Sequence, residues 1–237
     1  MISILGPNPN QVSHQNILDF LSLRKREFVD RLGWDLTHTD SAEWDDYDLP
    51  NALFVIAYEN GTCIGGARLM RTDRKTPRRD APDLTYMLGD FLSGNLCTGM
   101  SPDDMREPVE ANADTWEMTR FVGNPRVTEA LLAHVHDYLV EIGAHSVLTL
   151  SPRLMPIALR RLGYSVKVLS KPVEFDGKDY VAMRTLIRPG EAKPHRRPHA
   201  TPPRVLVEPA YTSAEFSTAA RAHSDHSNTQ LETAIPR

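Results

Sequence analysis

The sequence of 237 residues predicts a mixed α/β fold, in which one sheet of strands packs against helices. Three observations support this prediction. A helical pattern and a β-hairpin signal come first, strand and helix patterns then alternate, and the composition changes after Arg188. We therefore expect one folded domain over residues 1–188 and a flexible tail rich in Pro, Ser, Thr and His over residues 189–237.

The composition is that of a soluble globular protein, with 41% hydrophobic and 24% charged residues. A net charge of −4 gives no general attraction to nucleic acid or to an anionic membrane. No apolar run approaches the roughly 20 residues that span a bilayer, and the N-terminus does not resemble a signal peptide. The two cysteines, Cys63 and Cys97, suit free thiols in a reducing cytoplasm.

The first half of the chain predicts a helix and a hairpin. Residues 11–32 carry apolar side chains at helical spacing, with Arg and Lys between them. The apolar run 53–58 and its partner 63–70 flank an Asn60-Gly61 pair, which supplies the positive φ angles of a tight turn. Within the second run, Gly65-Gly66 indicates a bulge or a close backbone approach.

The rest of the domain predicts alternating elements. Residues 71–114 are irregular, with one short helix at 86–92. Asn124 and Pro125 then cap and open a helix that ends near Gly143. Strands are expected at 115–122, 145–150, 165–169 and 180–187, a short helix at 153–162, and a turn at Asp176-Gly177.

Three stretches place charged residues beside aromatic ones: residues 24–34, 45–48 and 116–121. Because buried charges are costly unless they are paired, the three together favour a polar site over three ordinary surface ion pairs. Asp45 and Asp48 are three apart, so one turn brings both to one side. Glu117 and Arg120 are three apart on a strand, which places them on opposite faces unless the strand is bulged. Such a site suits a zwitterionic or cationic small molecule.

Other chemistries have little support in the sequence. His134 and His136 are two apart on a helix and point in different directions, so no metal site is expected. The chain has no Gly-rich phosphate loop ending in Lys-Ser or Lys-Thr, and no Gly-x-Ser-x-Gly elbow. Nucleophilic catalysis by serine or cysteine is therefore not expected.

Five motifs in order resemble one family, the LuxI-type acyl-homoserine-lactone synthases. The resemblance covers roughly residues 20–188 and rests on residues 24–36, Asp45-Asp46-Tyr47-Asp48, Gly65-Gly66-Ala67-Arg68-Leu69, Tyr86-Met87-Leu88 and Trp116-Glu117-Met118-Thr119-Arg120-Phe121. It implies a GNAT-like acyltransferase fold, with a splayed, twisted mixed sheet and helices on both sides. It also implies a cytoplasmic bacterial enzyme of quorum sensing that needs no cofactor.

The resemblance implies two substrates, S-adenosylmethionine and an acyl thioester. The amine of S-adenosylmethionine attacks the thioester, and the methionyl carboxylate then closes the lactone and expels methylthioadenosine. By resemblance, the catalytic residues are Glu117 as the base with Arg120, Asp45, Asp48 and Arg68. The substrate-binding residues are Arg24, Phe28, Trp34, Phe121, Val122 and Ser151, with Phe121 and Val122 acting through backbone N–H groups and Ser151 beside carbon 3 of the acyl chain.

The acyl donor and two competing functions stay open at this point. Acyl carrier protein is the favoured donor and acyl-coenzyme A the alternative. Arg153, Arg160 and Arg161 are candidates for docking an acidic carrier or a phosphopantetheine phosphate, and the basic cluster from Arg71 to Arg79 is a second candidate. One competing function is a GNAT-type transferase that acylates another amine from acyl-coenzyme A. The other is a degenerate homologue that only binds a ligand.

Overall fold

The structure is a computed structural model that describes residues 2–96, 100–175 and 177–190. All of these residues belong to one compact unit, Met1–Val205. From residue 191 onward, the tail expected from the composition lies outside the described residues, as does Asp176 of the expected turn.

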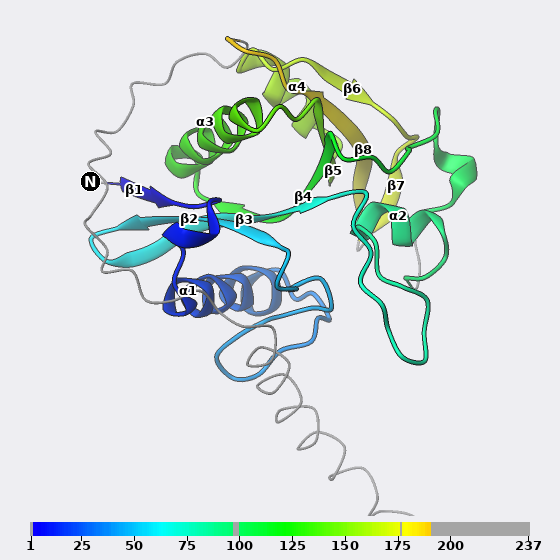
Figure 1. The fold of residues 1–237 in the computed structure, drawn as a ribbon. Helices are drawn as coiled ribbons and strands as arrows, with labels where there is room; N and C mark the ends of the chain where they lie inside the picture. The colour runs from blue at the N-terminus through cyan, green and yellow to red at the C-terminus, as the bar shows by residue number, and fades with distance from the viewer. Residues whose placement is uncertain (1, 97–99, 176, 191–237) are drawn as a thin grey trace, which may run out of the picture. The chain divides into compact units, whose positions relative to one another are not determined.

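A single sheet forms the centre of this unit, in the order β1-β2-β3-β4-β5-β8-β6, with β7 also paired to β8 (Figure 1). The strands are β1 (Ile2–Leu5), β2 (Leu53–Glu59), β3 (Thr62–Arg71), β4 (Thr115–Gly123), β5 (Ser146–Pro152), β6 (Val166–Val168), β7 (Val173–Phe175) and β8 (Lys178–Leu186). All pairs are antiparallel except β4 with β5, so the sheet is mixed, as the sequence predicts.

The parallel pair β4–β5 is short and the two strands then separate. Their pairing runs from Thr115 with Ser146 to Glu117 with Leu148. β4 nevertheless continues to Gly123, and β5 continues to Pro152. Beyond Glu117, therefore, β4 is paired only with β3, and the predicted splay of the sheet begins at the residue predicted to be the base.

Helices cover both faces of the sheet, with α1 (His14–Arg24) on one side and α3 (Pro125–Glu141) on the other (Figure 1). Two shorter helices are α2 (Met87–Leu92) and α4 (Met155–Arg161), and 3-10 turns occur at Pro9–Gln11 and Pro102–Asp104. Across the described residues, no helix reaches the length and hydrophobicity needed to cross a bilayer.

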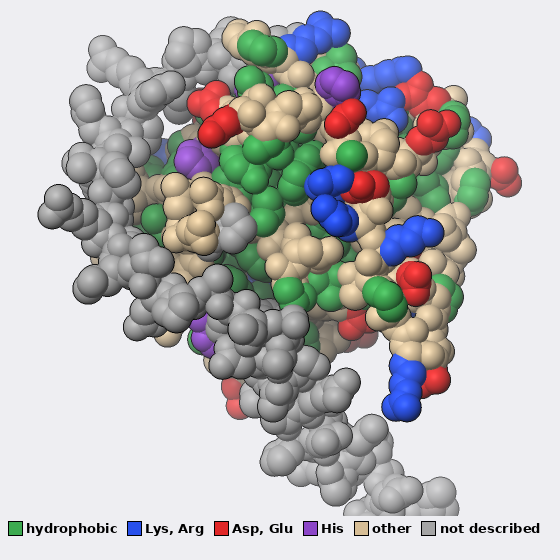
Figure 2. Space-filling view, in the orientation of Figure 1, with side chains coloured by type: hydrophobic (Ala, Val, Ile, Leu, Met, Phe, Trp, Pro, Cys, Tyr) green, Lys and Arg blue, Asp and Glu red, His purple; other side chains and the backbone are tan. Residues whose placement is uncertain are grey.

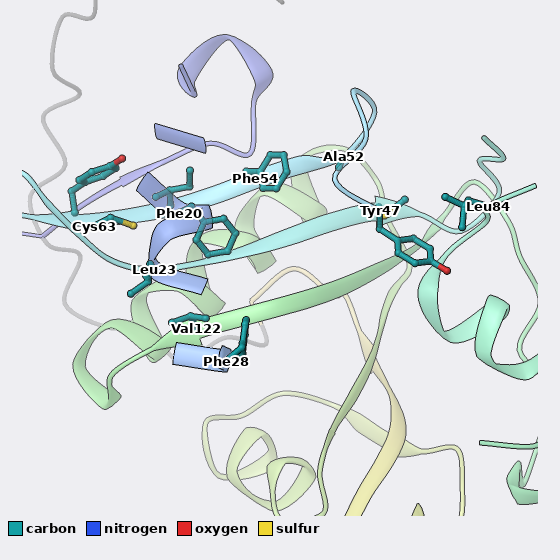
Figure 3. Close-up of a cluster of buried hydrophobic side chains, with 12 residues drawn as sticks. Phe20, Leu23, Phe28, Tyr47, Ala52, Phe54, Cys63, Leu84 and Val122 are labelled. Carbon is teal, nitrogen blue, oxygen red and sulfur yellow. The ribbon is translucent and has the colours of Figure 1, made fainter. Parts of the chain in front are cut away.

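The glycine pair of β3 allows both helices to approach the sheet closely. A Cβ at Gly66 would lie 2.7 Å from the Phe20 ring of α1, and one at Gly65 would lie 2.7 Å from Val127 of α3. Phe20 belongs to the apolar cluster between α1 and the sheet, together with Phe28 and Val122 (Figure 3). The predicted close approach at this pair is confirmed, because neither position has room for a side chain.

Most of the predicted turns and helix ends are confirmed. Asn60 and Gly61 both have positive φ, 51° and 79°, in the turn between β2 and β3. The Asn124 side chain accepts a hydrogen bond from the Val127 amide at the start of α3. The sequence did not indicate β1. The helix expected at 11–32 is α1 followed by a π-helix at Lys25–Arg31. The spacing of apolar residues does not distinguish the wider turn of a π-helix from an α-helical turn.

A β-bulge in β4 resolves the spacing of Glu117 and Arg120. Gly66 pairs with Val122 and Arg68 with Thr119, so Arg120 and Phe121 together lie opposite Ala67. Arg120 adopts a left-handed backbone conformation with φ of 52°. The extra residue turns the Arg120 side chain to the face that carries Arg68 and Thr119.

Candidate active site

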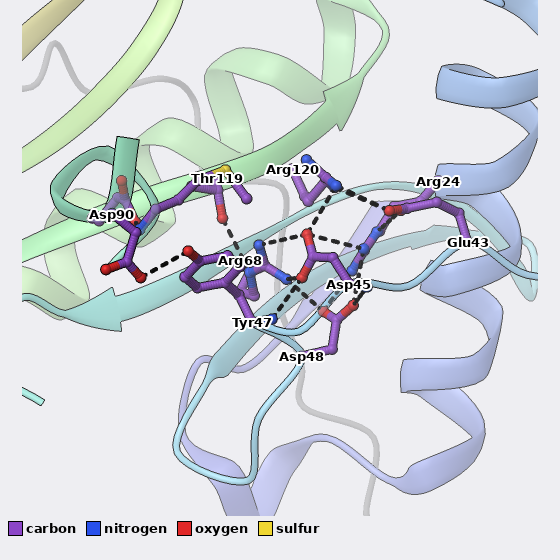
Figure 4. Close-up of polar contacts among 11 residues, drawn as sticks. Arg24, Glu43, Asp45, Tyr47, Asp48, Arg68, Asp90, Thr119 and Arg120 are labelled. Carbon is purple, nitrogen blue, oxygen red and sulfur yellow. Dashed lines mark hydrogen bonds and ion pairs between the residues drawn. The ribbon is translucent and has the colours of Figure 1, made fainter. Parts of the chain in front are cut away.

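Three arginines and three carboxylates form one ion-pair network between the end of α1, the loop before β2, and strands β3 and β4 (Figure 4). The arginines are Arg24, Arg68 and Arg120, and the carboxylates are Glu43, Asp45 and Asp48. The charges balance, which is the condition under which ionised groups are tolerated in a protein interior.

Arg24 ends α1 and is fully buried. Its Nε donates to Glu43 Oε2 at 2.5 Å, and its two Nη atoms donate to the two oxygens of Asp48 at 2.7 and 2.9 Å. These bonds raise the pKa of the Arg24 guanidinium although burial opposes the charge. Arg24, predicted to bind substrate, therefore lies inside the network.

Arg68 is the central cation of the network and is also fully buried. It donates through Nη1 to Asp48 Oδ1 at 2.8 Å and through both Nη atoms to Asp45, and its Nε donates to Thr119 Oγ1 at 3.1 Å. Burial raises the pKa of the Asp45 carboxyl, but the neighbouring arginines, Arg68 above all, hold it well below its usual range, so the carboxylate stays ionised.

Arg120 and Asp45 form the accessible end of the network. Arg120 contacts Glu43 Oε1 at 3.1 Å and Asp45 Oδ2 at 2.8 Å. The side chains of Arg120 and Asp45 are 11% and 17% exposed, whereas those of the other four members are 2% exposed or less. A ligand can reach the network through this pair.

Glu117 lies apart from the network, in β4. Its carboxylate accepts the backbone N–H groups of Met87 and Leu88, the first two residues of α2, both at 2.7 Å. Burial raises the pKa of Glu117 to about 7, although the two amides and Arg68 lower it. The hydrogen-bond partners of Glu117 are therefore backbone amides, whereas the arginines Arg68 and Arg120 bond the carboxylates of the network.

The aromatic residues predicted to cover a cationic ligand stack on one another. The Phe28 and Trp34 rings are parallel to within 6°, with centroids 5.0 Å apart. The Arg120 guanidinium lies 5.8 Å from the Phe28 ring centroid, which makes a cation–π contact. The π-helix that contains Phe28 thus joins the accessible end of the network.

The other predicted substrate-binding residues lie along the diverging strands. Phe121 is half-buried on the α3 side of the sheet, and Val122 is buried on the α1 side. Ser151 is half-buried near the end of β5. Two residues earlier on the same strand, Thr149 lines a cavity of about 30 Å³ between the sheet and α3.

Sequence reasoning missed four residues of the site. Glu43 bonds both Arg24 and Arg120, and the available signal was its place two residues before Asp45. Thr119 accepts from Arg68. Tyr47 and Asp90 are bonded to each other across 43 positions of sequence, and such a long-range contact has no local pattern.

The separation of β4 from β5 at Glu117 agrees with the splayed sheet expected of a GNAT-like acyltransferase. The autoinducer synthase family matches residues 8–187, and the chain belongs to this family. It is therefore an acyl-homoserine-lactone synthase, a transferase, and the predicted family, fold class and enzyme class are confirmed.

Several acyl-homoserine-lactone synthases are similar to this chain. The protein from Acinetobacter nosocomialis is 26% identical over 74% of this chain and 94% of its own length. The protein from Pseudomonas aeruginosa is 25% identical over 77% of this chain and 85% of its own length.

Solved structures of such synthases share the fold. TofI, in a ternary complex with an inhibitor and MTA, superposes with a TM-score of 0.63 at 25% identity, over 79% of this chain and 91% of TofI. BjaI, a CoA-dependent acyl-homoserine lactone synthase with SAM and isopentyl-CoA, has a TM-score of 0.63 at 19% identity, over 80% of this chain and 84% of BjaI.

Proposed function

We propose that this synthase joins S-adenosylmethionine to an acyl group from acyl carrier protein, and that both chemical steps take place between Glu117 and the Asp45–Arg120 end of the network. One observation carries this proposal: a buried carboxylate with a pKa near 7 lies where β4 leaves β5. The complex of TofI with MTA supports an adenosyl substrate, because methylthioadenosine is the product released in this scheme.

The first step is acylation of the amine. The α-ammonium of S-adenosylmethionine must lose a proton before it can attack, and an ordinary α-amino group has a pKa of about 8. Glu117, with a pKa of about 7, accepts that proton, directly or through a water. The nitrogen then bonds to the thioester carbonyl carbon, the carbon–sulfur bond breaks, and the carrier leaves as a thiol.

The second step is ring closure. An oxygen of the methionyl carboxylate bonds to its own γ-carbon, and the bond from that carbon to sulfur breaks, which releases neutral methylthioadenosine. The Arg120 guanidinium can bind the substrate carboxylate, and Asp45, which pairs with Arg120, faces the positive charge of the substrate. Arg24, Glu43, Asp48 and Arg68 hold these two side chains in place. No further cofactor enters this scheme.

The surface of α4 favours a carrier protein as donor. Leu154 and Ile157, at the start of this helix, are 71% and 47% exposed. Arg161 is exposed on the same helix, and Lys and Arg side chains, with Asp and Glu side chains among them, lie along the upper edge of the face in Figure 2, over the region of α4 and β6. An apolar pair beside basic groups fits an acidic protein that also offers apolar side chains.

The proposal is tested with purified protein, S-adenosylmethionine and a matched pair of donors, the same acyl group on acyl carrier protein and on coenzyme A. We expect lactone and methylthioadenosine in equal amounts, with a higher kcat/KM for the carrier protein. Mass spectrometry measures both products. Turnover of the thioester without methylthioadenosine would contradict lactone synthesis, and a preference for coenzyme A would contradict the choice of donor.

A further inference from the structure

Tyr47 connects the ion network to α2. It lies between Asp45 and Asp48 in the chain, and the Arg68 guanidinium lies 5.7 Å from its ring centroid. Its hydroxyl donates to Asp90 Oδ2 at 2.8 Å (Figure 4). Tyr47 and Asp90 are only 2% and 1% exposed, so this hydrogen bond is formed away from water.

Asp90 is fixed by several donors besides Tyr47. The Thr85 amide and hydroxyl donate to its two oxygens at 2.9 and 2.8 Å, and Asn95 Nδ2 donates at 3.3 Å. Asp90 belongs to α2, a helix of only six residues. A helix this short does not form on its own, so its position depends on contacts such as these.

The same helix holds Glu117, since the first two amides of α2 donate to its carboxylate. Two residues further along β4, Thr119 accepts a hydrogen bond from Arg68, the residue that packs on Tyr47. The contacts therefore form a closed ring, which runs from Glu117 through α2, Asp90, Tyr47, Arg68 and Thr119 back to β4.

We propose that Tyr47 and Asp90 are positioning residues for the reaction: their hydrogen bond holds the amides of α2 on Glu117 and thereby fixes the direction and the charge of the base. This inference rests on the proposed role of Glu117. In this proposal α2 has a second role besides packing, because the helix links Glu117 to the guanidinium of Arg68 through Asp90 and Tyr47.

Loss of the Tyr47 hydroxyl has a predictable effect on Glu117. The two amide bonds favour the ionised carboxylate, so a looser α2 raises the pKa of Glu117 above its value of about 7. The other groups that act on Glu117 are Arg68 from β3, Asp90 from α2, and the tyrosines Tyr47 and Tyr86. The Tyr47→Phe substitution leaves the charge of each of these groups unchanged.

The test compares Tyr47→Phe with the wild-type enzyme over a range of pH. We expect kcat to fall between about tenfold and a hundredfold, because a displaced base loses its alignment. The acid limb of the kcat/KM profile moves to higher pH, and KM for S-adenosylmethionine stays within about twofold. The control is Tyr58→Phe, which removes a part-buried hydrogen bond of the same length, 2.8 Å, from a tyrosine to Asp19, together with the acceptor of Asn16 Nδ2.

Two further variants keep the test decisive if Tyr47→Phe is poorly stable. Asp90→Asn retains an oxygen that accepts from Tyr47, so it is expected to be more active than Asp90→Ala. The double variant Tyr47→Phe/Asp90→Ala is expected to lose no more kcat than Asp90→Ala alone, since both changes break one contact.

Unchanged kcat and an unchanged acid limb in Tyr47→Phe, with turnover still severely lowered in Glu117→Ala, would overturn this inference alone. Full activity of Glu117→Ala would overturn the proposed base and this inference together. Equal losses in Tyr47→Phe and Tyr58→Phe would show that the Tyr47 bond has only a general structural effect, and would also overturn the inference.

Discussion

The carboxylates of the site occupy two different surroundings on one face of the sheet. Glu43, Asp45 and Asp48 each contact at least one guanidinium, and the strong positive field keeps the pKa of Asp45 low. Glu117 is only 2% exposed, its two hydrogen bonds come from neutral amides, and its pKa rises to about 7. Asp45 is partly exposed and contacts arginines, so both the burial and the partners of the two carboxylates differ.

The difference in pKa between the two kinds of carboxylate suits them to different tasks: one kind binds a substrate, and the other transfers a proton. A carboxylate that stays ionised throughout the physiological range can bind and orient a cation, but it is a weak base. A carboxylate that titrates near neutral pH can accept a proton and return it. The chain thus places both kinds within one site, by surrounding one kind with arginines and the other with the start of a helix.

The largest expected effect is from Glu117→Ala. Turnover should fall by about 10²- to 10⁴-fold, because general base catalysis contributes on that scale. Lactone formation and circular dichroism would be measured together, with Glu141→Ala at an exposed position of α3 as the control. Near-wild-type turnover with an intact fold would show that Glu117 is not the base, and its role would then not differ from that of the network carboxylates.

Replacing Arg68 by Met tests the network as a structural unit. The change leaves the buried Asp45 and Asp48 with fewer partners, so the free energy of unfolding should fall by about 3 to 5 kcal/mol. Denaturant unfolding measures this. Arg71→Met is the control, because Arg71 and Asp73 are 29% and 31% exposed and their pair should be worth under about 1 kcal/mol. Equal losses for the two variants would contradict a special role for the buried network.

The dependence of kcat/KM on pH tests the difference between Glu117 and Asp45 in the wild-type enzyme. Since Glu117 acts as a base only when it is ionised and its pKa is about 7, kcat/KM should fall about tenfold for each pH unit below that value. Asp45, with a lowered pKa, remains ionised over the same range. Steady-state rates between pH 5 and 9 would report this, and a flat profile across pH 7 would assign the proton transfer to another group.

The smallest effect is expected at the surface of α4, a helix that contributes no member of the ion-pair network. Arg161→Glu should raise KM for acyl carrier protein several-fold, more at low salt, and leave KM for S-adenosylmethionine unchanged. Arg126→Glu is a suitable control, because Arg126 is also exposed but lies at the start of α3. Identical KM values for the two variants would exclude α4 as the docking surface.

Local sequence signals were sufficient for much of the fold. The Asn60-Gly61 turn, the Asn124 cap and the glycine pair of β3 each depend on a backbone requirement that few residue types meet. The π-helix after α1 and the strand β1 were not predicted. Both make long-range contacts that have no local pattern: β1 pairs with β2, and Phe28 of the π-helix contacts Arg120 of β4.

The sequence predicted most of the residues of the site, but it did not predict which hydrogen bonds join them. The spacing of Asp45 and Asp48 correctly predicted that both lie to one side, where both contact Arg68. The odd spacing of Glu117 and Arg120 left a bulge as one alternative, and the bulge is present. The partners of Glu117 could not be predicted, because they are backbone amides from a segment 29 residues away. The roles of the individual residues stay predictions until the variants are measured.

The separation of β4 from β5 also has a consequence for hydrogen exchange. After Glu117, β4 is paired with β3 alone, so the amides of residues 118–123 that point toward β5 lack the strand partner that earlier residues have. They should exchange with deuterium faster than the amides that face β3. A thioester arm lying between the two strands would slow this exchange. Isotope uptake in β4 would then report occupancy by the acyl donor without any turnover.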